Sequence, residues 1–105
     1  MIEGHIYKLF DEELKELKEK ILFEGSLVQS AVHNAIDALM NRDSELARKV
    51  IEDDDLINTK EVEVDEFCTK LLALRQPAAK DLRFITTAIK INYDLERIEL
   101  PHIQD

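Results

Sequence analysis

The chain has 105 residues, of which 45% are hydrophobic and 35% charged, and its formal net charge is −9. This composition fits one soluble, all-α domain rather than a disordered chain, and two glycines and two prolines predict a few long helices. The acidic balance offers no basic footprint for nucleic-acid phosphates and repels an anionic lipid surface, so we expect neither nucleic-acid binding nor direct membrane insertion.

The first predicted helix covers about residues 5–41, where apolar residues recur at helical spacing. Gly25 interrupts this pattern at a cost of roughly 1 kcal/mol relative to alanine, which a long packed helix tolerates. The residues expected on its apolar face are Ile6, Leu9, Leu14, Leu17, Ile21, Val28, Val32, Ile36 and Leu39.

The second predicted helix covers about residues 44–75. Asp43 or Ser44 is expected as its N-cap, with Glu45 placing a negative charge near the positive end of the helix dipole. A heptad spacing along this helix predicts packing at a shallow crossing angle. The apolar residues of this spine are Val50, Ile57, Val64 and Leu71, with Leu46 and Cys68 beside them.

The third predicted helix covers about residues 78–99, after a break at Gln76 and with Pro77 in its first turn. Pro101 should end it. The helix is apolar on two faces, and three helices alone cover only one of them well. The first face contains Leu82, Ile85, Ile89 and Tyr93, and the second contains Phe84, Ile91, Leu95 and Ile98.

Acidic and amide side chains form one stripe on the second helix. Its members are Asp54, Asn58, Glu61 and Asp65. Glu61 and Asp65 are four residues apart, so their carboxylates repel unless a positive charge lies between them. A hard cation, or iron bound through oxygen, would supply that charge, and a solvated acidic face is the alternative.

Glu96 on the third helix is close to the line of Ile89 and Tyr93, so it should point toward the bundle and need a partner. A metal ligand and a structural ion pair both fit this position. The arginines that could form such a pair are Arg75, Arg83 and Arg97.

Catalytic patterns are absent from the sequence. Glu99 and His102 have the spacing of di-iron carboxylate bundles, but there is one copy and Pro101 interrupts it. There is no Gly-x-Ser-x-Gly elbow and no glycine-rich phosphate loop. We therefore expect a protein that is not an enzyme.

The single cysteine, Cys68, excludes an intramolecular disulfide and favours a reducing compartment. Its apolar neighbours favour a packed core thiol over a nucleophile. The N-terminus lacks a signal peptide pattern, and no apolar run approaches the roughly 20 residues of a membrane span. We expect a cytoplasmic protein.

The stretch from Arg42 to Ile98 closely resembles one repeat of the PhoU family. The resemblance is carried by Asp-Asp-Leu-Ile-Asn at 54–58, Glu-Val-Glu-Val-Asp at 61–65, Leu-Leu-Ala-Leu-Arg-Gln-Pro at 71–77, Asp-Leu-Arg at 81–83 and Asp-Leu-Glu-Arg-Ile at 94–98. It implies an antiparallel three-helix bundle, spectrin-like and up-down-up, with residues 1–105 as the first of the two tandem repeats that the family normally has.

The resemblance also implies a role. PhoU proteins act with the phosphate-specific ABC transporter and its sensor histidine kinase, and they restrain phosphate uptake and the starvation response when phosphate is plentiful. Some members bind iron or zinc clusters through paired acidic motifs on the second and third helices. By this resemblance Glu61 and Asp65 form the first motif and Glu96 begins the second. Together with Asp54 and Asn58 of the acidic stripe, they are the expected metal ligands.

The chain departs from the family pattern after Ile98. Glu99 and Leu100 occupy the positions of a glycine and an aspartate, so the second acidic motif lacks one oxygen ligand and metal binding should be weaker. The second repeat is absent, which suggests a truncated or altered copy. An unpaired repeat leaves an apolar helix-three surface bare, so we expect self-association as a dimer.

Overall fold

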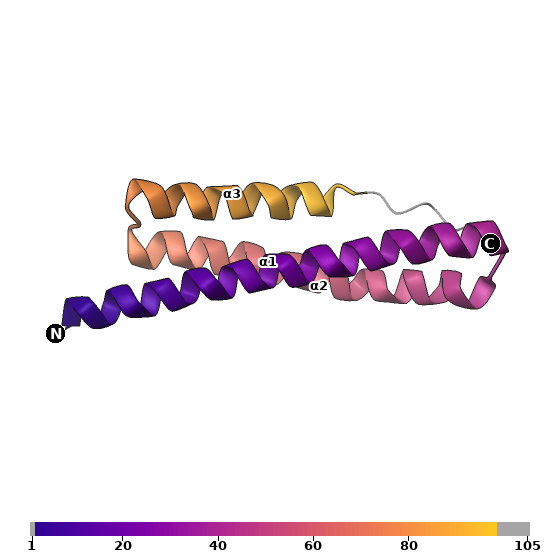
Figure 1. Ribbon diagram of the computed structural model, residues 1–105, viewed down its shortest axis with the longest axis horizontal. Coiled ribbons are helices and arrows are strands. Elements are labelled where there is room, and N and C mark those ends of the chain that lie inside the picture. Colours follow the sequence, from indigo (N-terminus) through magenta and orange to yellow (C-terminus); the bar gives the residue numbers. More distant parts are fainter. Residues whose placement is uncertain (1, 99–105) are drawn as a thin grey trace.

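The computed structural model describes the backbone of residues 2–98 and, within this range, the side chains of residues 4 and 8–98. These residues form three helices: α1 (Ile2–Asn41), α2 (Ser44–Arg75) and α3 (Ala79–Glu96). The helices run up, down and up in an elongated bundle about 60 Å long (Figure 1). The expected all-α three-helix bundle is therefore confirmed. Glu99, Leu100, Pro101, His102 and the side chains of His5 and Ile6 lie outside the described residues.

The α1–α2 turn follows the prediction. Asp43 is the N-cap of α2, where its side chain accepts a hydrogen bond from the backbone N–H of Leu46 at 3.1 Å. Glu45 lies in the first turn, where its charge favours the positive end of the helix dipole. The helix α1 continues through Gly25 without interruption.

The α2–α3 turn is placed as predicted, but the role given to Pro77 is wrong. Gln76 ends α2 in the left-handed conformation, with φ 44° and ψ 61°. Ala78, extended at φ −65° and ψ 163°, is the N-cap of α3, and its carbonyl accepts a hydrogen bond from Leu82 at 2.8 Å. Pro77 therefore precedes the helix instead of lying in its first turn. The other end of α3 is at Glu96, three residues before the predicted end at 99.

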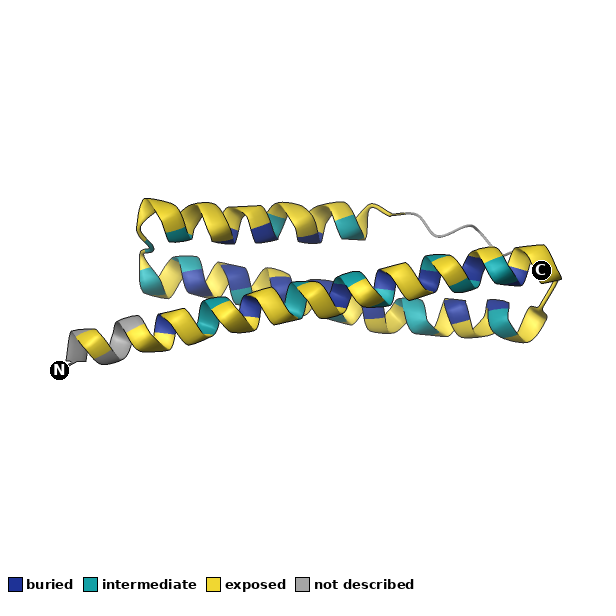
Figure 2. Cartoon of the chain, viewed as in Figure 1, coloured by how far each residue is buried: buried dark blue, intermediate teal, exposed yellow. Residues whose placement is uncertain are grey.

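The core contains two apolar clusters along the bundle axis. The first joins all three helices through Phe10, Leu17, Val64, Cys68, Leu71, Ile85 and Ala88. The second is smaller and contains Val28, Ala31 and Ile57, with Leu95 packed against it. Every member of the predicted α2 heptad is buried: Val64 and Leu71 lie in the cluster that joins all three helices, and Val50 lies where α2 packs against α1. Figure 2 shows the buried positions of the three helices facing one another.

The predicted apolar face of α1 is correct only in part. Leu17 and Val28 are buried, whereas Ile36 and Leu39 are each 49% exposed and Leu9 is 38% exposed. Near the end of α1 the buried residues are Ala35 and Ala38, and the first turns of α2 have Ala47 and Val50 buried. Among the described residues α3 does not extend along this part (Figure 1), so α1 and α2 pack there as a pair. Small side chains allow that close approach.

The predicted core face of α3 also differs from the structure. Its buried residues are Ile85, Ala88 and Asn92, whereas Tyr93 is 57% exposed. The buried stripe is therefore rotated from the predicted one, because a small residue and an amide occupy two of the three core positions. On the other apolar face, Phe84 and Ile91 are exposed as expected.

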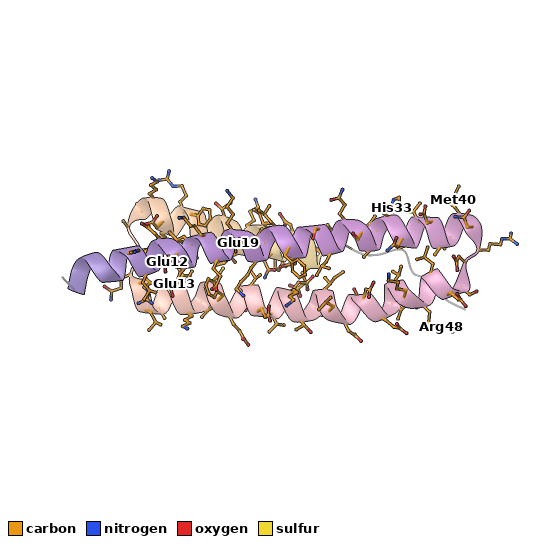
Figure 3. All side chains as sticks on the ribbon, turned by 60° about the horizontal axis from the view of Figure 1, so that its bottom comes forward. Glu12, Glu13, Glu19, His33, Met40 and Arg48 are labelled. Carbon is orange, nitrogen blue, oxygen red and sulfur yellow. The ribbon has the colours of Figure 1, made fainter. Side chains whose placement is uncertain are left out.

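An ion pair joins the first third of α1 to the end of α2. The guanidinium of Arg75 donates to the carboxylate of Glu13 from Nε at 2.7 Å and from Nη2 at 3.2 Å. Figure 3 shows Glu13 on α1 beside the last turns of α2, close to the α2–α3 turn. This contact engages one of the three arginines proposed as a partner for Glu96.

Candidate functional site

A surface hollow between α2 and α3, about 400 Å³ in volume, brings together most of the predicted metal-binding residues. It is lined by Asn58, Glu61, Val62, Asp65, Ile89, Asn92, Tyr93 and Glu96. The i, i+3 and i+4 spacing on α2 places three of these polar side chains on one stripe beside the core-facing heptad. Four of the five predicted site residues therefore meet in one hollow. Asp54 is half-buried on α2 and does not line it.

Glu61 is the inner member of this set, since it is 8% exposed whereas Asn58, Asp65 and Glu96 are exposed. The prediction that Glu96 points into the bundle is thus wrong in detail. Its side chain borders the hollow but remains open to solvent, because the buried stripe of α3 passes through Asn92 instead. None of the three ion pairs among the described side chains includes Glu96.

Asn92 links α3 to α2 at the base of the hollow. Its side-chain Nδ2 donates a hydrogen bond to the backbone carbonyl of Glu61 at 3.0 Å. Asn92 is 6% exposed, and its Oδ1 has no hydrogen-bond partner within the described part of the chain. A buried amide oxygen without a partner is costly, which marks this position as a place for a donor or a cation.

Glu24 on α1 is a buried carboxylate near Glu61 and Glu96 that sequence reasoning missed. It is 0% exposed, and neither carboxylate oxygen has a hydrogen-bond partner among the described groups. A signal was present in the sequence: Glu24 lies three residues after Ile21 and four before Val28, within the apolar stripe of α1. A charged residue at such a position needs an explanation, because carboxylates are rarely buried without a partner.

Glu24, Glu61 and Asn92 form a polar layer across the bundle. On α1, Glu24 lies between Leu17 of the first core cluster and Val28 of the second. On α2, Glu61 lies between Ile57 and Val64, which belong to the second and first clusters. Asn92 has the same place on α3, between Ala88 and Leu95. One polar residue from each helix therefore separates the two apolar clusters.

The carboxylates of this region disfavour one another's charge. The pKa of Glu24 is raised from its ordinary 4.5 to about 7, first by burial and then by the nearby carboxylates of Glu61 and Glu96. The pKa of Glu61 is also raised, first by burial and then by Glu96 and Asp54. Carboxylates from all three helices are thus close enough to interact without a basic neighbour that offsets them.

The donor chemistry of the hollow suits a hard cation or iron, because all its candidate ligands are carboxylate or amide oxygens. In the conformation described for residues 2–98, no three His, Cys, Asp or Glu side chains are grouped so that they could hold a metal ion. A cation at this place would therefore require the carboxylates to turn toward one another, and the orphaned oxygen of Asn92 is available as a further ligand.

The prediction for the reactive side chain of Cys68 can also be followed in the structure. Cys68 is fully buried, as predicted, and burial raises the pKa of its thiol to about 11, which makes it a poor nucleophile. His33 is exposed on α1, with its Nε2 at 3.3 Å from Asp37, well along the helix from Glu24. No helix among residues 2–98 is long and apolar enough to cross a membrane.

The chain is similar to a known protein family over most of its length. The family model described as "PhoU domain" matches residues 21–98. The chain is 45% identical over 94 residues to the phosphate-specific transport system accessory protein PhoU of Serratia marcescens. It is 47% identical to the PhoU homolog of Pseudomonas aeruginosa and 40% identical to PhoU of Escherichia coli K12 over alignments of the same length.

These alignments cover 90% of this chain but 39% of each of the three relatives. The chain thus spans about two fifths of the length of the proteins it matches. No solved structure matched the chain.

Proposed function

The chain belongs to the PhoU family, and on this basis we propose that it regulates phosphate uptake and phosphate-starvation signalling in the cytoplasm. It acts by contacts with the phosphate ABC transporter and its sensor histidine kinase, and it restrains both when phosphate is plentiful. The observation that carries this proposal is the identity of 45–47% over 90% of the chain to accessory proteins of phosphate transport. An accessory role needs no catalytic residues.

A cell-based experiment tests this regulatory role. The chain is expressed in a bacterial strain that lacks its own PhoU protein, and a phosphate-starvation promoter is followed with a reporter at high phosphate. Repression relative to empty vector supports the proposal, and a full-length relative serves as the positive control. A folded, expressed chain that leaves the reporter fully active would contradict it, and the chain would then be a helical fragment without regulatory activity.

The acidic hollow is proposed as a metal centre for iron or zinc, held by Asn58, Glu61, Asp65 and Glu96. Asp54, the fifth residue indicated by the sequence, lies outside its lining and would have to turn toward it. A bound cation would neutralise carboxylates that otherwise repel one another, and it would fix α2 against α3. Leu100 in place of an aspartate removes one oxygen ligand, so binding is expected to be weaker than with a complete pair of motifs. Elemental analysis of the untagged protein, with Glu61→Ala as the control, tests for this centre.

Self-association as a homodimer is proposed through the uncovered side of α3. A groove of about 210 Å³ runs between α1 and α3, and its lining is almost wholly apolar. The lining residues are Leu17, Lys18, Ile21, Leu22, Phe84, Thr87, Ala88 and Ile91. A second copy of the chain is the occupant, because Leu22, Phe84 and Ile91 are exposed around the groove and can meet the same residues of a partner across a two-fold axis.

Sedimentation velocity over a range of concentrations tests the dimer. Phe84→Glu should shift the equilibrium to monomer, because it places a charge on the apolar contact. Thr86→Glu is the matched control, since Thr86 is exposed on α3 but does not line the groove. A chain that remains monomeric at high concentration, or a Phe84→Glu variant that associates as strongly as the original, would contradict this contact.

A further inference from the structure

We propose that Glu24 on α1 and Asn92 on α3 are, together with Glu61 on α2, ligands of a divalent cation bound in the polar layer inside the bundle. The inference rests on the metal centre proposed above and extends it inward, from the α2–α3 hollow to the third helix. Neither Glu24 nor Asn92 belongs to the acidic stripe that the sequence indicates. The cation class is a hard divalent ion with oxygen ligands, such as Mn²⁺ or Fe²⁺.

The first support is the set of orphaned oxygens. Within the described residues, three buried side-chain atoms lack a hydrogen-bond partner, and they are Glu24 Oε1, Glu24 Oε2 and Asn92 Oδ1. All three are oxygen acceptors, and all belong to the polar layer. A set of buried acceptors with no donor is what a cation satisfies, since it needs several oxygens and brings the missing positive charge.

The second support is the charge balance around the layer. Lys60 pairs with Glu63 at 3.3 Å, and Arg75 pairs with Glu13. Among the described residues, none of the ion pairs includes Glu24 or Glu61. Both carboxylates are buried in a chain with a net charge of −9. The uncompensated charge therefore lies at the centre of the fold.

The third support is access. Asn92 and Glu61 both line the α2–α3 hollow and also belong to the polar layer. A cation entering from solvent thus meets Asp65 and Glu96 at the exposed rim before it reaches the inner carboxylates. Glu24 supplies from α1 one further carboxylate at the inner side of this layer.

Binding of Mn²⁺ to the 105-residue chain tests the inference. Metal is removed with chelator, Mn²⁺ is added back at neutral pH, and the bound metal is measured by equilibrium dialysis and electron paramagnetic resonance. The same samples are unfolded thermally with and without Mn²⁺. Glu24→Gln and Asn92→Leu are each expected to weaken Mn²⁺ binding about tenfold or more, and to abolish the Mn²⁺-dependent rise in Tm.

Three controls separate a ligand role from a structural one. Circular dichroism in chelator shows whether each variant is folded, and Glu24→Gln should fold well, because it removes a buried charge. Glu12→Gln, at an exposed position of the same helix, should bind Mn²⁺ as the original chain does. Asp65→Asn tests the rim of the hollow independently of the inner layer.

The outcomes distinguish this inference from the proposed centre. Mn²⁺ binding that survives Glu24→Gln and Asn92→Leu but fails in Asp65→Asn overturns the inference and leaves the outer centre standing. Binding lost in the inner variants but kept in Asp65→Asn supports the inner site and counts against the outer ligands. A chain that takes up neither Mn²⁺, iron nor zinc overturns both.

Discussion

Replacing Glu24 by glutamine should make the metal-free protein more stable at alkaline pH and change its stability much less at acidic pH. The side chain is fully buried without a partner, and its pKa in the folded chain is about 7 instead of 4.5. Glutamine has nearly the same shape and never carries the charge. The difference between the two proteins therefore reports the cost of ionising Glu24 inside the bundle.

The pKa shift sets both the magnitude and the sign of this effect. Between the two pKa values the folded state holds a proton that the unfolded state has released, so the free energy of unfolding falls as pH rises. The favourable contribution of protonated Glu24 is complete below about pH 4.5 and is lost as pH rises through about 7. At pH values above the folded pKa, ionisation of Glu24 lowers the free energy of unfolding by about 3 kcal/mol. Near pH 5.5 it lowers that free energy by about 1 kcal/mol.

Urea unfolding followed by circular dichroism, in chelator and at one protein concentration, measures the difference. The free energy of unfolding of Glu24→Gln should be higher than that of the original chain by about 3 kcal/mol near pH 8. Near pH 5.5 the difference should be about 1 kcal/mol. Glu12→Gln, on the exposed side of α1, serves as the matched control and should show no such pH-dependent gain. Parallel stability curves for Glu24→Gln and the original chain across this range would refute the reasoning.

Three smaller changes test other parts of the structure. Gly25→Ala should stabilise the fold by about 0.5–1 kcal/mol in thermal unfolding, because Gly25 lies within α1 and an added Cβ meets nothing within 4 Å. An unchanged or lower Tm would show that this position is more crowded than described. Ala78→Asp should gain about 1 kcal/mol, because the N-cap of α3 has no side-chain hydrogen bond, and a loss of stability would contradict the assigned cap. The thiol of Cys68 should react with a thiol reagent at least about 100-fold more slowly in the folded chain than in urea, because it is fully buried and its pKa is raised, whereas equal rates would exclude its place in the core.

The fold could be predicted well where hydrophobic side chains alone define the pattern. The heptad of α2 from Val50 to Leu71 is buried throughout, by α1 alone near Val50 and by both neighbouring helices around Leu71. The α1–α2 boundary also followed from local chemistry, since Asp43 caps the helix through its own side chain. The prediction of Pro77 as a helical residue was wrong, because the extended backbone at Ala78 comes between the proline and the first turn.

The prediction was poorer where polar or small residues take core positions. The core face of α3 that was predicted from hydrophobicity included Tyr93 and omitted Ala88 and Asn92. In the structure Ala88 and Asn92 are buried and Tyr93 is exposed. The same preference placed Ile36 and Leu39 in the core instead of the alanines beside them. Glu24 was overlooked for the converse reason, because a charged residue is normally assigned to the surface. Only the three-dimensional register shows that it lies level with Glu61 and Asn92.

The polar layer also separates two parts of the molecule that differ in packing, and we expect each to open as a unit. On one side, three helices enclose large side chains such as Leu17 and Leu71; on the other, α1 and α2 form a hairpin held largely by alanines such as Ala35. Amide hydrogens of the hairpin should therefore exchange with solvent through local opening, whereas those around Leu17 should exchange only when the whole chain unfolds. A proton or cation bound by Glu24, Glu61 and Asn92 changes the contacts between these two parts. It should therefore change how strongly local unfolding of the hairpin is coupled to unfolding of the three-helix part.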